Sequence, residues 1–222
     1  MSAGHVVFVR HGRTHYNAAL RLQGQVDIEL DAVGRWQATA AAPALLRSIR
    51  PAKIVASDLS RAHATGLEIA TLAGLELGID VRLRERSFGP WEGLTRPEIK
   101  DQWPAESAEW LAGREPGLAG VETKRAVAER MVAAIEDLGA DLGSKDTLVL
   151  VSHGAAITCA IMGLLGQDPA NWRGMGGLQN VHWSVVGRNT AKDASPGWRL
   201  EEHNVGLSAL HGSQTWANGI TN

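Results

Sequence analysis

Three polar motifs in this sequence each follow directly after a short apolar run. The motifs are Arg10-His11-Gly12, Ser57-Asp58-Leu59-Ser60-Arg61 and Ser152-His153-Gly154. Such apolar runs are typical of strands buried on both faces of a parallel sheet, and ligands of these sheets bind at the carboxyl ends of the strands. If the three strands are neighbours, the two arginines and the two histidines of these motifs meet in one pocket.

This set of side chains suits the transfer of a phosphoryl group. The guanidinium groups of Arg10 and Arg61 are permanently charged forks that match the oxygens of a phosphate. A neutral imidazole can attack phosphorus and form a phosphohistidine, which makes His11 the predicted nucleophile. A second imidazole, from His153, can donate to the equatorial oxygens as negative charge spreads over them. Gly12 would leave room for the backbone to approach the anion.

Glu85 is the predicted general acid, which would protonate the leaving oxygen. This role needs a raised pKa, and desolvation could supply it against the positive charges of Arg82, Arg84 and Arg86. The alternative is a surface carboxylate that forms ion pairs with those three arginines. Each feature alone is weak, because a histidine after a buried strand is more often a structural hydrogen-bonding group. The prediction depends on all of them together.

The motifs depend for their positions on strands that alternate with helices. Strands are expected at 5–9, 53–56 and 147–151, with two later strands at 181–186 and 198–203. Helices are expected at 34–49, 59–73, 122–138 and 155–165. Asp31 provides a start signal for the first helix and Gly74 a stop signal for the second, whereas Pro43 is expected to kink or break the first. The alternation predicts an α/β layered fold with a mostly parallel central sheet.

The chain of 222 residues, with 44% apolar and 21% charged residues, is typical of one globular domain. We expect a single domain over 1–222, although the length also allows two small ones. Segment 86–120 contains four prolines and several tryptophans, and we expect it to form an irregular cap over the edge of the sheet. Residues 212–222 are small and polar, which predicts a loose tail.

The composition also bears on partners and location. The formal net charge is −2, and no basic excess points to nucleic acid. Cys159 is the only cysteine, so no intramolecular disulfide can form, and a reducing compartment fits. The N-terminus lacks the pattern of a signal peptide, and the apolar run at 155–165 is too short to span a bilayer. We therefore expect a cytoplasmic protein without a membrane partner. Because the histidines outside the motifs lack metal-ligand spacing, we expect neither a metal nor a cofactor.

The order and spacing of the motifs resemble the histidine phosphatase superfamily, also called phosphoglycerate mutase-like. The matching stretches are 8–12 with Asn17, 57–62 with Thr65, 82–85 with 89–93, and 151–154. The resemblance implies a three-layer α/β/α sandwich and a homodimer. It implies that His11 is phosphorylated and that Glu85 donates the proton. The remaining phosphate contacts would come from Arg10, Arg61 and His153.

The resemblance also implies substrate contacts. Asn17 matches the family's asparagine that touches phosphate, and Gln23 and Gly24 match a loop that reaches the substrate. Arg13 is a departure, because many members, mutases especially, have Glu or Gln at this place. It adds positive charge beside the pocket, which predicts a further substrate contact and disfavours a mutase.

Three stretches resemble a narrower branch of the family, the actinobacterial phosphatases of glucosyl-3-phosphoglycerate. They lie at 22–30, 171–180 and 198–200. The short segment 93–121 has no counterpart of the basic capping segment of cofactor-dependent mutases, and an open pocket would let water reach the phosphohistidine. We therefore expect a phosphatase for a small phosphorylated metabolite. The alternatives are a phosphoglycerate mutase, a phosphatase for another sugar or nucleotide-loop phosphate, and a non-catalytic phosphate-binding scaffold.

Overall fold

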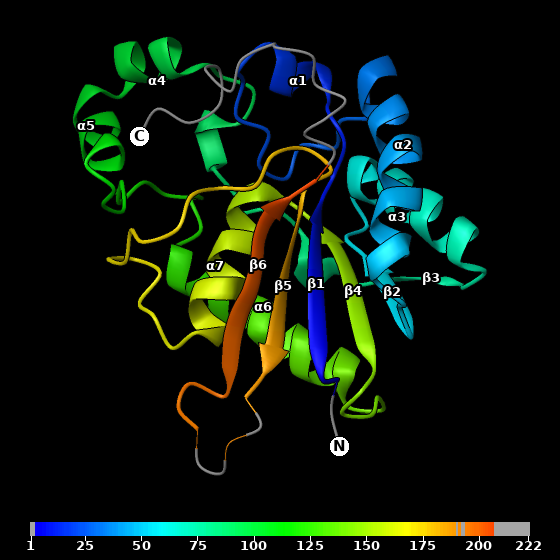
Figure 1. Cartoon of the computed structure of the whole chain (residues 1–222). Coiled ribbons are helices and arrows are strands. Elements are labelled where there is room, and N and C mark those ends of the chain that lie inside the picture. Colours follow the sequence, from blue (N-terminus) through cyan, green and yellow to red (C-terminus); the bar gives the residue numbers. More distant parts are fainter. Residues whose placement is uncertain (1–2, 190, 192–193, 207–222) are drawn as a thin grey trace.

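A six-stranded sheet forms the centre of the computed structural model, which describes residues 3–189, 191 and 194–206 (Figure 1). Its strands are β1 (His5–Arg10), β2 (Lys53–Ala56), β3 (Leu77–Ile79), β4 (Thr147–Ser152), β5 (Trp183–Arg188) and β6 (Trp198–Val205). Their order across the sheet is β3-β2-β4-β1-β5-β6. The first four strands pair in parallel, whereas β5 runs antiparallel to β1, and β6 antiparallel to β5. The predicted tail at 212–222 lies outside the described residues.

The five predicted strands are confirmed, and one further strand was not predicted. β1 and β4 run one residue further than expected, to Arg10 and Ser152. β5 begins later than predicted because Val181, with φ of 55°, leaves the extended conformation. The extra strand, β3, has only three residues with a glycine at its centre, so its sequence shows no alternation of apolar and polar positions.

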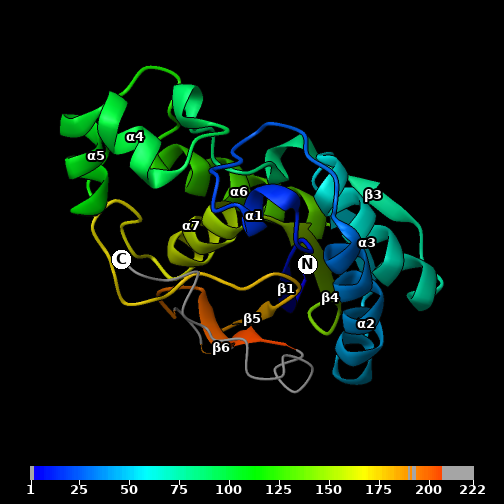
Figure 2. The ribbon, with the colours of Figure 1, turned by 90° about the horizontal axis from the view of Figure 1, so that it is seen from above.

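Two pairs of helices cover the two faces of the sheet (Figure 2). The pairs are α2 (Ala32–Ser48) with α3 (Ser60–Ala73) on one face, and α6 (Lys124–Gly139) with α7 (Gly154–Leu164) on the other. Side chains of β1 alternate between two apolar clusters. Val6 and Phe8 pack with residues of α6 and α7, whereas Val7 and Val9 pack with residues of α2 and α3. The structure is therefore the predicted three-layer α/β/α sandwich.

The predicted signals at helix ends are confirmed, but Pro43 does not break α2. The side chain of Asp31 accepts a hydrogen bond from the backbone N–H of Gly34, and Gly74 ends α3 in the left-handed conformation with φ of 68°. Pro43 lies inside α2, and both Pro43 and Thr39 are exposed. Because proline has no N–H, the carbonyl of Thr39 lacks the hydrogen bond that the helix would otherwise provide. Because water can bind that carbonyl, the expected break is wrong and the helix continues to Ser48.

Segment 86–120 is more regular than the expected irregular cap. It contains the short turn η2 (Gly89–Trp91) and the helices α4 (Arg96–Gln102) and α5 (Pro104–Leu111). Pro97 and Pro104 lie in the first turns of α4 and α5, where a missing N–H removes no helical hydrogen bond. The prolines therefore start helices instead of disrupting them. Trp91 and Ile99 are fully buried in a small core within this segment.

Helix α7 is apolar but has only 11 residues. Within the part of the chain that the structure describes, no helix combines the length and the apolar character needed to cross a bilayer. Cys159 lies on α7 inside an apolar cluster, as predicted, and burial raises the pKa of its thiol to about 12. The thiol is therefore un-ionised at neutral pH.

Candidate active site

The carboxyl ends of β1, β2 and β4 lie side by side because β4 pairs in parallel with both other strands. His11 follows β1, and its backbone N–H donates to the carbonyl of Ser152 at the end of β4. His153 follows β4, and Arg61 lies in the first turn of α3. The rings of His11 and His153 lie 5.1 Å apart, measured between their centroids. We call Arg10, His11, Arg61 and His153 the strand-end pocket; the structure brings them together, and their catalytic roles stay predictions.

The tautomer of His11 is fixed by its neighbour in sequence. Nδ1 of His11 lies 2.7 Å from the carbonyl oxygen of Gly12, and a carbonyl can only accept. Nδ1 therefore carries the proton, and Nε2 keeps its lone pair. Burial, reinforced by the charges of Arg61 and Arg10, holds the pKa of His11 well below its usual value of 6.5. His11 is thus a neutral imidazole with a bare Nε2 at neutral pH.

His153 has the opposite tautomer. Nε of Arg61 donates to Nδ1 of His153 at 3.2 Å, so the ring proton of His153 lies on Nε2. Burial, followed by the charge of Arg61, lowers the pKa of His153 well below 6.5. Nε2 of His153 and Nε of Arg10 are buried and have no hydrogen-bond partner among the described residues. Buried donors are normally paired, so these two suit the oxygens of a bound anion.

Backbone carbonyls hold both arginines of the pocket in place. Arg10 donates from Nη1 to the carbonyl of Leu178 at 2.5 Å. Arg61 donates to the carbonyls of Gly24 and Val26 at 2.7 and 2.8 Å. Burial lowers the pKa of Arg61 to about 10, which still leaves it charged at neutral pH. The pocket therefore presents two fixed positive charges.

Glu85 lies at the N-terminus of α7, beside the strand-end pocket. Its Oε2 accepts the backbone N–H of Ala155 at 3.2 Å, and its Oε1 accepts those of Ala156 and Arg86 at 2.9 and 2.8 Å. These three backbone N–H groups hold the carboxylate in place. Glu85 is partly buried, and its predicted role as general acid stays a prediction.

The three arginines that flank Glu85 in sequence form ion pairs with other carboxylates. The pairs are Arg82 with Asp80 at 2.7 Å, Arg84 with Asp58 at 2.5 Å, and Arg86 with Glu115 at 2.5 Å. The alternative that Glu85 is the ion-pair partner of these arginines is therefore wrong. Its carboxylate is instead held by backbone N–H groups.

The residues predicted to touch substrate lie around Thr14, the N-cap of the short helix α1 (His15–Ala18). Oδ1 of Asn17 accepts the backbone N–H of Thr14, and Oε1 of Gln23 accepts its hydroxyl at 2.9 Å. Gly24 has φ of 53°, and its carbonyl binds Arg61. These contacts join the loop to the strand-end pocket, while contact of Asn17, Gln23 and Gly24 with a substrate stays a prediction.

Arg13 does not present a free charge. Its Nε donates to Oδ2 of Asp31 at 2.8 Å, so the carboxylate that caps α2 balances the guanidinium. The added positive charge expected from Arg13 is therefore largely neutralised. Its role in substrate binding stays a prediction.

Gly12 also has a structural use that was not predicted, while its place beside a bound anion stays a prediction. A Cβ atom at this position would lie 2.5 Å from the backbone oxygen of Gly34, at the start of α2. A Cβ on Gly34 would in turn meet the backbone of Arg13. The absence of both side chains lets α2 begin directly against the end of β1.

Two residues without a predicted role hold the backbone around His11. The backbone N–H of Gly12 donates to the hydroxyl of Thr65 at 3.0 Å, and that hydroxyl donates to the carbonyl of Arg61. Nδ2 of Asn180 donates to the carbonyl of His11 at 2.9 Å. Thr65 and Asn180 both lie in stretches that resemble the family, but only the folded chain shows what they bind.

No group of three or more His, Cys, Asp or Glu side chains is placed to hold a metal ion among residues 3–189, 191 and 194–206. The independence from metals and cofactors stays a prediction.

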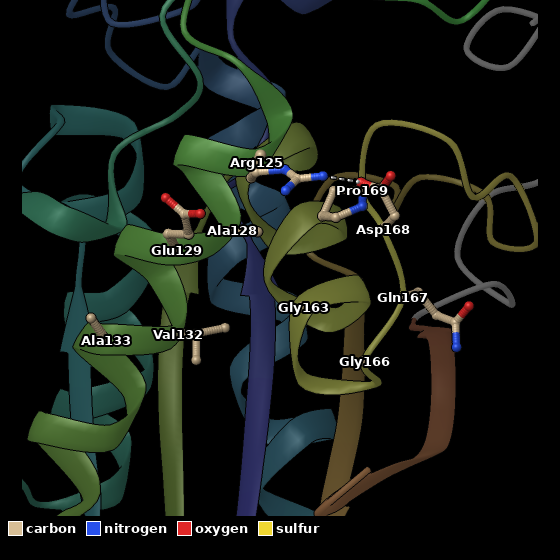
Figure 3. Close-up of a pocket in the computed structure, with 10 residues that line it drawn as sticks. All are labelled: Arg125, Ala128, Glu129, Val132, Ala133, Gly163, Gly166, Gln167, Asp168 and Pro169. Carbon is tan, nitrogen blue, oxygen red and sulfur yellow. Dashed lines mark hydrogen bonds and ion pairs between the residues drawn. The ribbon is translucent and has the colours of Figure 1, made fainter. Parts of the chain in front are cut away.

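A separate surface hollow of about 620 Å³ lies between α6 and α7 (Figure 3). Ala128, Val132 and Gly163 give it an apolar part of its lining, and Arg125 and Asp168, which form an ion pair, also line it. It shares no lining residue with the strand-end pocket. Because it lacks the buried arginines and histidines, its size does not make it the reactive site.

Known proteins resemble this chain over most of its length. A sequence model of the histidine phosphatase superfamily (branch 1) matches residues 6–205. The glucosyl-3-phosphoglycerate phosphatase of Mycolicibacterium vanbaalenii is 36% identical over 218 residues, which cover 92% of this chain and 96% of that protein. The probable phosphoglycerate mutase GpmB of Yersinia enterocolitica is 37% identical over 203 residues, which cover 88% and 90%.

The structure of a mycobacterial glucosyl-3-phosphoglycerate phosphatase in complex with VO3 has a TM-score of 0.80 to this one. It is 36% identical in sequence, and the match covers 90% of this chain and 98% of that chain. The extent of these matches confirms the resemblance drawn from the motifs, and the chain belongs to the histidine phosphatase superfamily.

Proposed function

We propose that this protein hydrolyses a small phosphomonoester through a phosphohistidine on His11. The observation that carries the proposal is the pair of opposite tautomers in the strand-end pocket. His11 has a bare Nε2, which attack on phosphorus requires. His153 has an unpaired Nε2–H, which suits an oxygen that gains negative charge in the transition state.

In the first half of the reaction, Arg10 and Arg61 hold the phosphate oxygens while Nε2 of His11 forms a bond to phosphorus. The bond from phosphorus to the leaving oxygen breaks, and Glu85 gives that oxygen a proton. The carbonyl of Gly12 accepts from Nδ1 of His11 and stabilises the positive charge that the ring gains.

In the second half, water attacks the phosphorus of the phosphohistidine. Glu85 takes a proton from this water, and the bond from phosphorus to Nε2 breaks with its electron pair returning to His11. Inorganic phosphate leaves, and both side chains are restored. His153 donates to the phosphoryl oxygens in both steps.

We propose glucosyl-3-phosphoglycerate as the substrate. The support is that relatives with this activity in their names are 36% identical over almost the whole chain. The contacts would come from the loop that carries Asn17, Gln23 and Gly24, and from Arg13 beside it. The residues that choose the substrate are thus separate from those that transfer the phosphoryl group.

A phosphoglycerate mutase is the second candidate, favoured by the 37% identity to the probable mutase of Yersinia enterocolitica. A mutase returns the phosphoryl group to the substrate instead of passing it to water. It would interconvert 3-phosphoglycerate and 2-phosphoglycerate faster than it releases phosphate.

The test is a screen of glucosyl-3-phosphoglycerate, 3-phosphoglycerate and sugar phosphates for release of phosphate and for isomerisation. We expect the highest kcat/KM for phosphate release from glucosyl-3-phosphoglycerate. His11→Ala should abolish turnover and any acid-labile phosphoenzyme, whereas His5→Gln, at the opposite end of β1, should retain activity. Isomerisation faster than hydrolysis would support the mutase, and a largely active His11→Ala variant would disprove the mechanism.

We also infer that residues 1–222 form a single domain and that the protein is cytoplasmic and works as a homodimer. Its partner is a small phosphorylated metabolite, and it binds neither nucleic acid nor a membrane. The net charge of −2, the single buried cysteine and the family resemblance support this inference. Light scattering after size-exclusion chromatography tests the dimer. Assays after treatment with EDTA test the independence from metal.

A further inference from the structure

The residues around Glu85 are held by side chains and not by a sheet. Four consecutive backbone carbonyls, from Arg82 to Glu85, each accept a hydrogen bond from a side chain. The hydroxyl of Ser152 binds the carbonyl of Leu83 at 2.7 Å. The position of Glu85 therefore depends on a few polar side chains from distant parts of the sequence.

Arg130, on α6, supplies most of these contacts. Its Nη1 donates to the carbonyls of Arg82 and Arg84 at 2.6 and 2.8 Å, and its Nη2 donates to the carbonyl of Glu85 at 3.1 Å. Nε2 of Gln25 donates to the same carbonyl of Glu85 at 3.1 Å. The two donors fill both lone pairs of that oxygen.

A carboxylate fixes the guanidinium of Arg130 in turn. Nε and Nη2 of Arg130 bind the two oxygens of Glu122 at 2.7 and 2.9 Å, and both side chains are only 20% exposed. Such a paired fork loses little freedom for each hydrogen bond it forms. Glu122 also binds the backbone that follows Glu85 in sequence, because its Oε2 accepts the backbone N–H of Ser87 at 3.3 Å. The pair therefore holds the chain on both sides of Glu85.

We propose that Arg130 is a positioning residue that aligns Glu85 for proton transfer to the leaving oxygen. The inference rests on the proposed function, in which Glu85 is the acid. The carboxylate of Glu85 is anchored to the N-terminus of α7, and its backbone is anchored to α6 through Arg130. Loss of the second anchor would let the acid move by a fraction of an ångström, which slows a step that requires aligned atoms.

Arg130 has one other route to the strand-end pocket. Burial lowers the pKa of His153 most, the charge of Arg61 comes next, and the charge of Arg130 contributes least. An effect through His153 would act on the phosphoryl oxygens and would slow all substrates alike. An effect through Glu85 would slow mainly substrates with poor leaving groups, because good leaving groups need no proton.

The test compares an alkyl phosphate, 3-phosphoglycerate or the preferred substrate of the screen, with p-nitrophenyl phosphate. For Arg130→Gln we expect kcat/KM to fall at least about tenfold more on the alkyl phosphate than on the aryl phosphate, and for Arg130→Lys a smaller split of the same sign. The matched control is Arg188→Gln, because Arg188 also binds a carboxylate and a backbone carbonyl, those of Glu136 and Ala3. It lies at the opposite end of the sheet, so both substrates should change equally.

Two further variants make the result decisive: the double variant of Glu85→Gln with Arg130→Gln, and the single variant Arg130→Lys. In a Glu85→Gln background, Arg130→Gln should add no further split between the two substrates. An equal loss on both substrates, or no loss, in Arg130→Gln would overturn the proposal while a split in Glu85→Gln keeps the acid assignment. If Arg130→Gln does not fold, Arg130→Lys decides. A larger loss of kcat/KM on the alkyl phosphate than on the aryl phosphate supports the proposal, and any other result overturns it. No phosphate release by the wild-type protein would contradict the proposed function itself.

Discussion

The strand-end pocket and the segment around Glu85 meet in one site but are built by different contacts. Arg10 ends the strand β1, whose two faces are buried, and the backbone N–H of His11 adds one more hydrogen bond to β4. Glu85 lies between the short turn η1 (Val81–Leu83) and η2, where side-chain donors replace a ladder. The groups proposed to bind phosphate are thus held by the fold itself, whereas the proposed proton donor is held by polar pairs.

The largest expected effect tests the rigid half of this comparison. Arg61→Lys should lower kcat/KM at least about 100-fold on alkyl and aryl phosphates alike, because a lysine cannot bind His153, Gly24 and Val26 at once. Steady-state kinetics with both substrates measures the loss. Arg84→Lys, in the partly exposed pair with Asp58, is the control and should change kcat/KM little. If Arg61→Lys lowered kcat/KM by less than about threefold, which is the effect expected for an exposed ion pair, the idea of a rigid pocket would be contradicted.

The next effect tests the half that holds the proton donor. Glu85→Gln should lower kcat about 100-fold or more on alkyl phosphates and far less on p-nitrophenyl phosphate. The same kinetics gives both numbers. Glu98→Gln, in the capping box at the start of α4, is a matched control and should leave the ratio unchanged. Equal losses on both substrates in Glu85→Gln would remove Glu85 as the acid.

The buried histidines predict how stability depends on pH. Unfolded, each histidine takes a proton near pH 6.5, but in the fold the pKa values of His11 and His153 are well below it. The unfolded state therefore binds more protons than the folded state below pH 6.5. As the pH is lowered, the free energy of unfolding decreases by up to about 1.4 kcal/mol per pH unit for each histidine. The fall ends at the lowered pKa values. Urea unfolding in phosphate-free buffer between pH 7 and 5 measures the slope.

Two variants check which groups cause that slope. His11→Gln should reduce it, because one of the two buried imidazoles is gone. Asp58→Asn should leave it unchanged, since Arg84 lowers the pKa of Asp58 below its ordinary value of 3.8 and its contribution is lost only at lower pH. An unchanged slope in His11→Gln would show that His11 does not resist protonation in the fold.

The smallest effects compare Thr65, which supports the backbone around His11, with Thr95, which caps α4 beyond the segment around Glu85. Thr65→Val leaves the buried N–H of Gly12 without its acceptor, which should cost about 1–3 kcal/mol of stability and lower kcat. Thr95→Ala removes the cap of α4, which should cost about 1 kcal/mol and leave kcat unchanged. Unfolding curves and kinetics of both variants test this contrast. Equal losses of kcat in both variants would mean that the effect of Thr65→Val does not come from the backbone around His11.

The sequence predicted the strand-end pocket because its signals are local. Each strand, its polar end and the following helix lie within a few residues of one another, and parallel pairing brings such ends together. The same local signals misjudged Pro43, since its cost depends on whether the carbonyl of Thr39 meets water or protein. They also missed β3, which is too short to show a period.

The surroundings of Glu85 could not be predicted in this way. Its flanking arginines pair with carboxylates as far away in sequence as Asp137, which is 55 residues from Arg82, and its backbone is bound by Arg130. The tautomer of His153 likewise depends on Arg61, which is 92 residues away. Such partners are chosen by packing in three dimensions, and no period or spacing in one chain reveals them.

The close approach of Gly12 to Gly34 has a consequence for protein design. The glycine that completes the motif Arg10-His11-Gly12 serves the junction between β1 and α2 and has no reacting group of its own. A designer who copies the two arginines and two histidines onto another sheet must therefore also copy the helix that begins against them. In a scaffold whose next helix starts further from the end of the strand, neither glycine would be needed. The residues that correspond to His11 and Gly12 would then lack the packing against that helix.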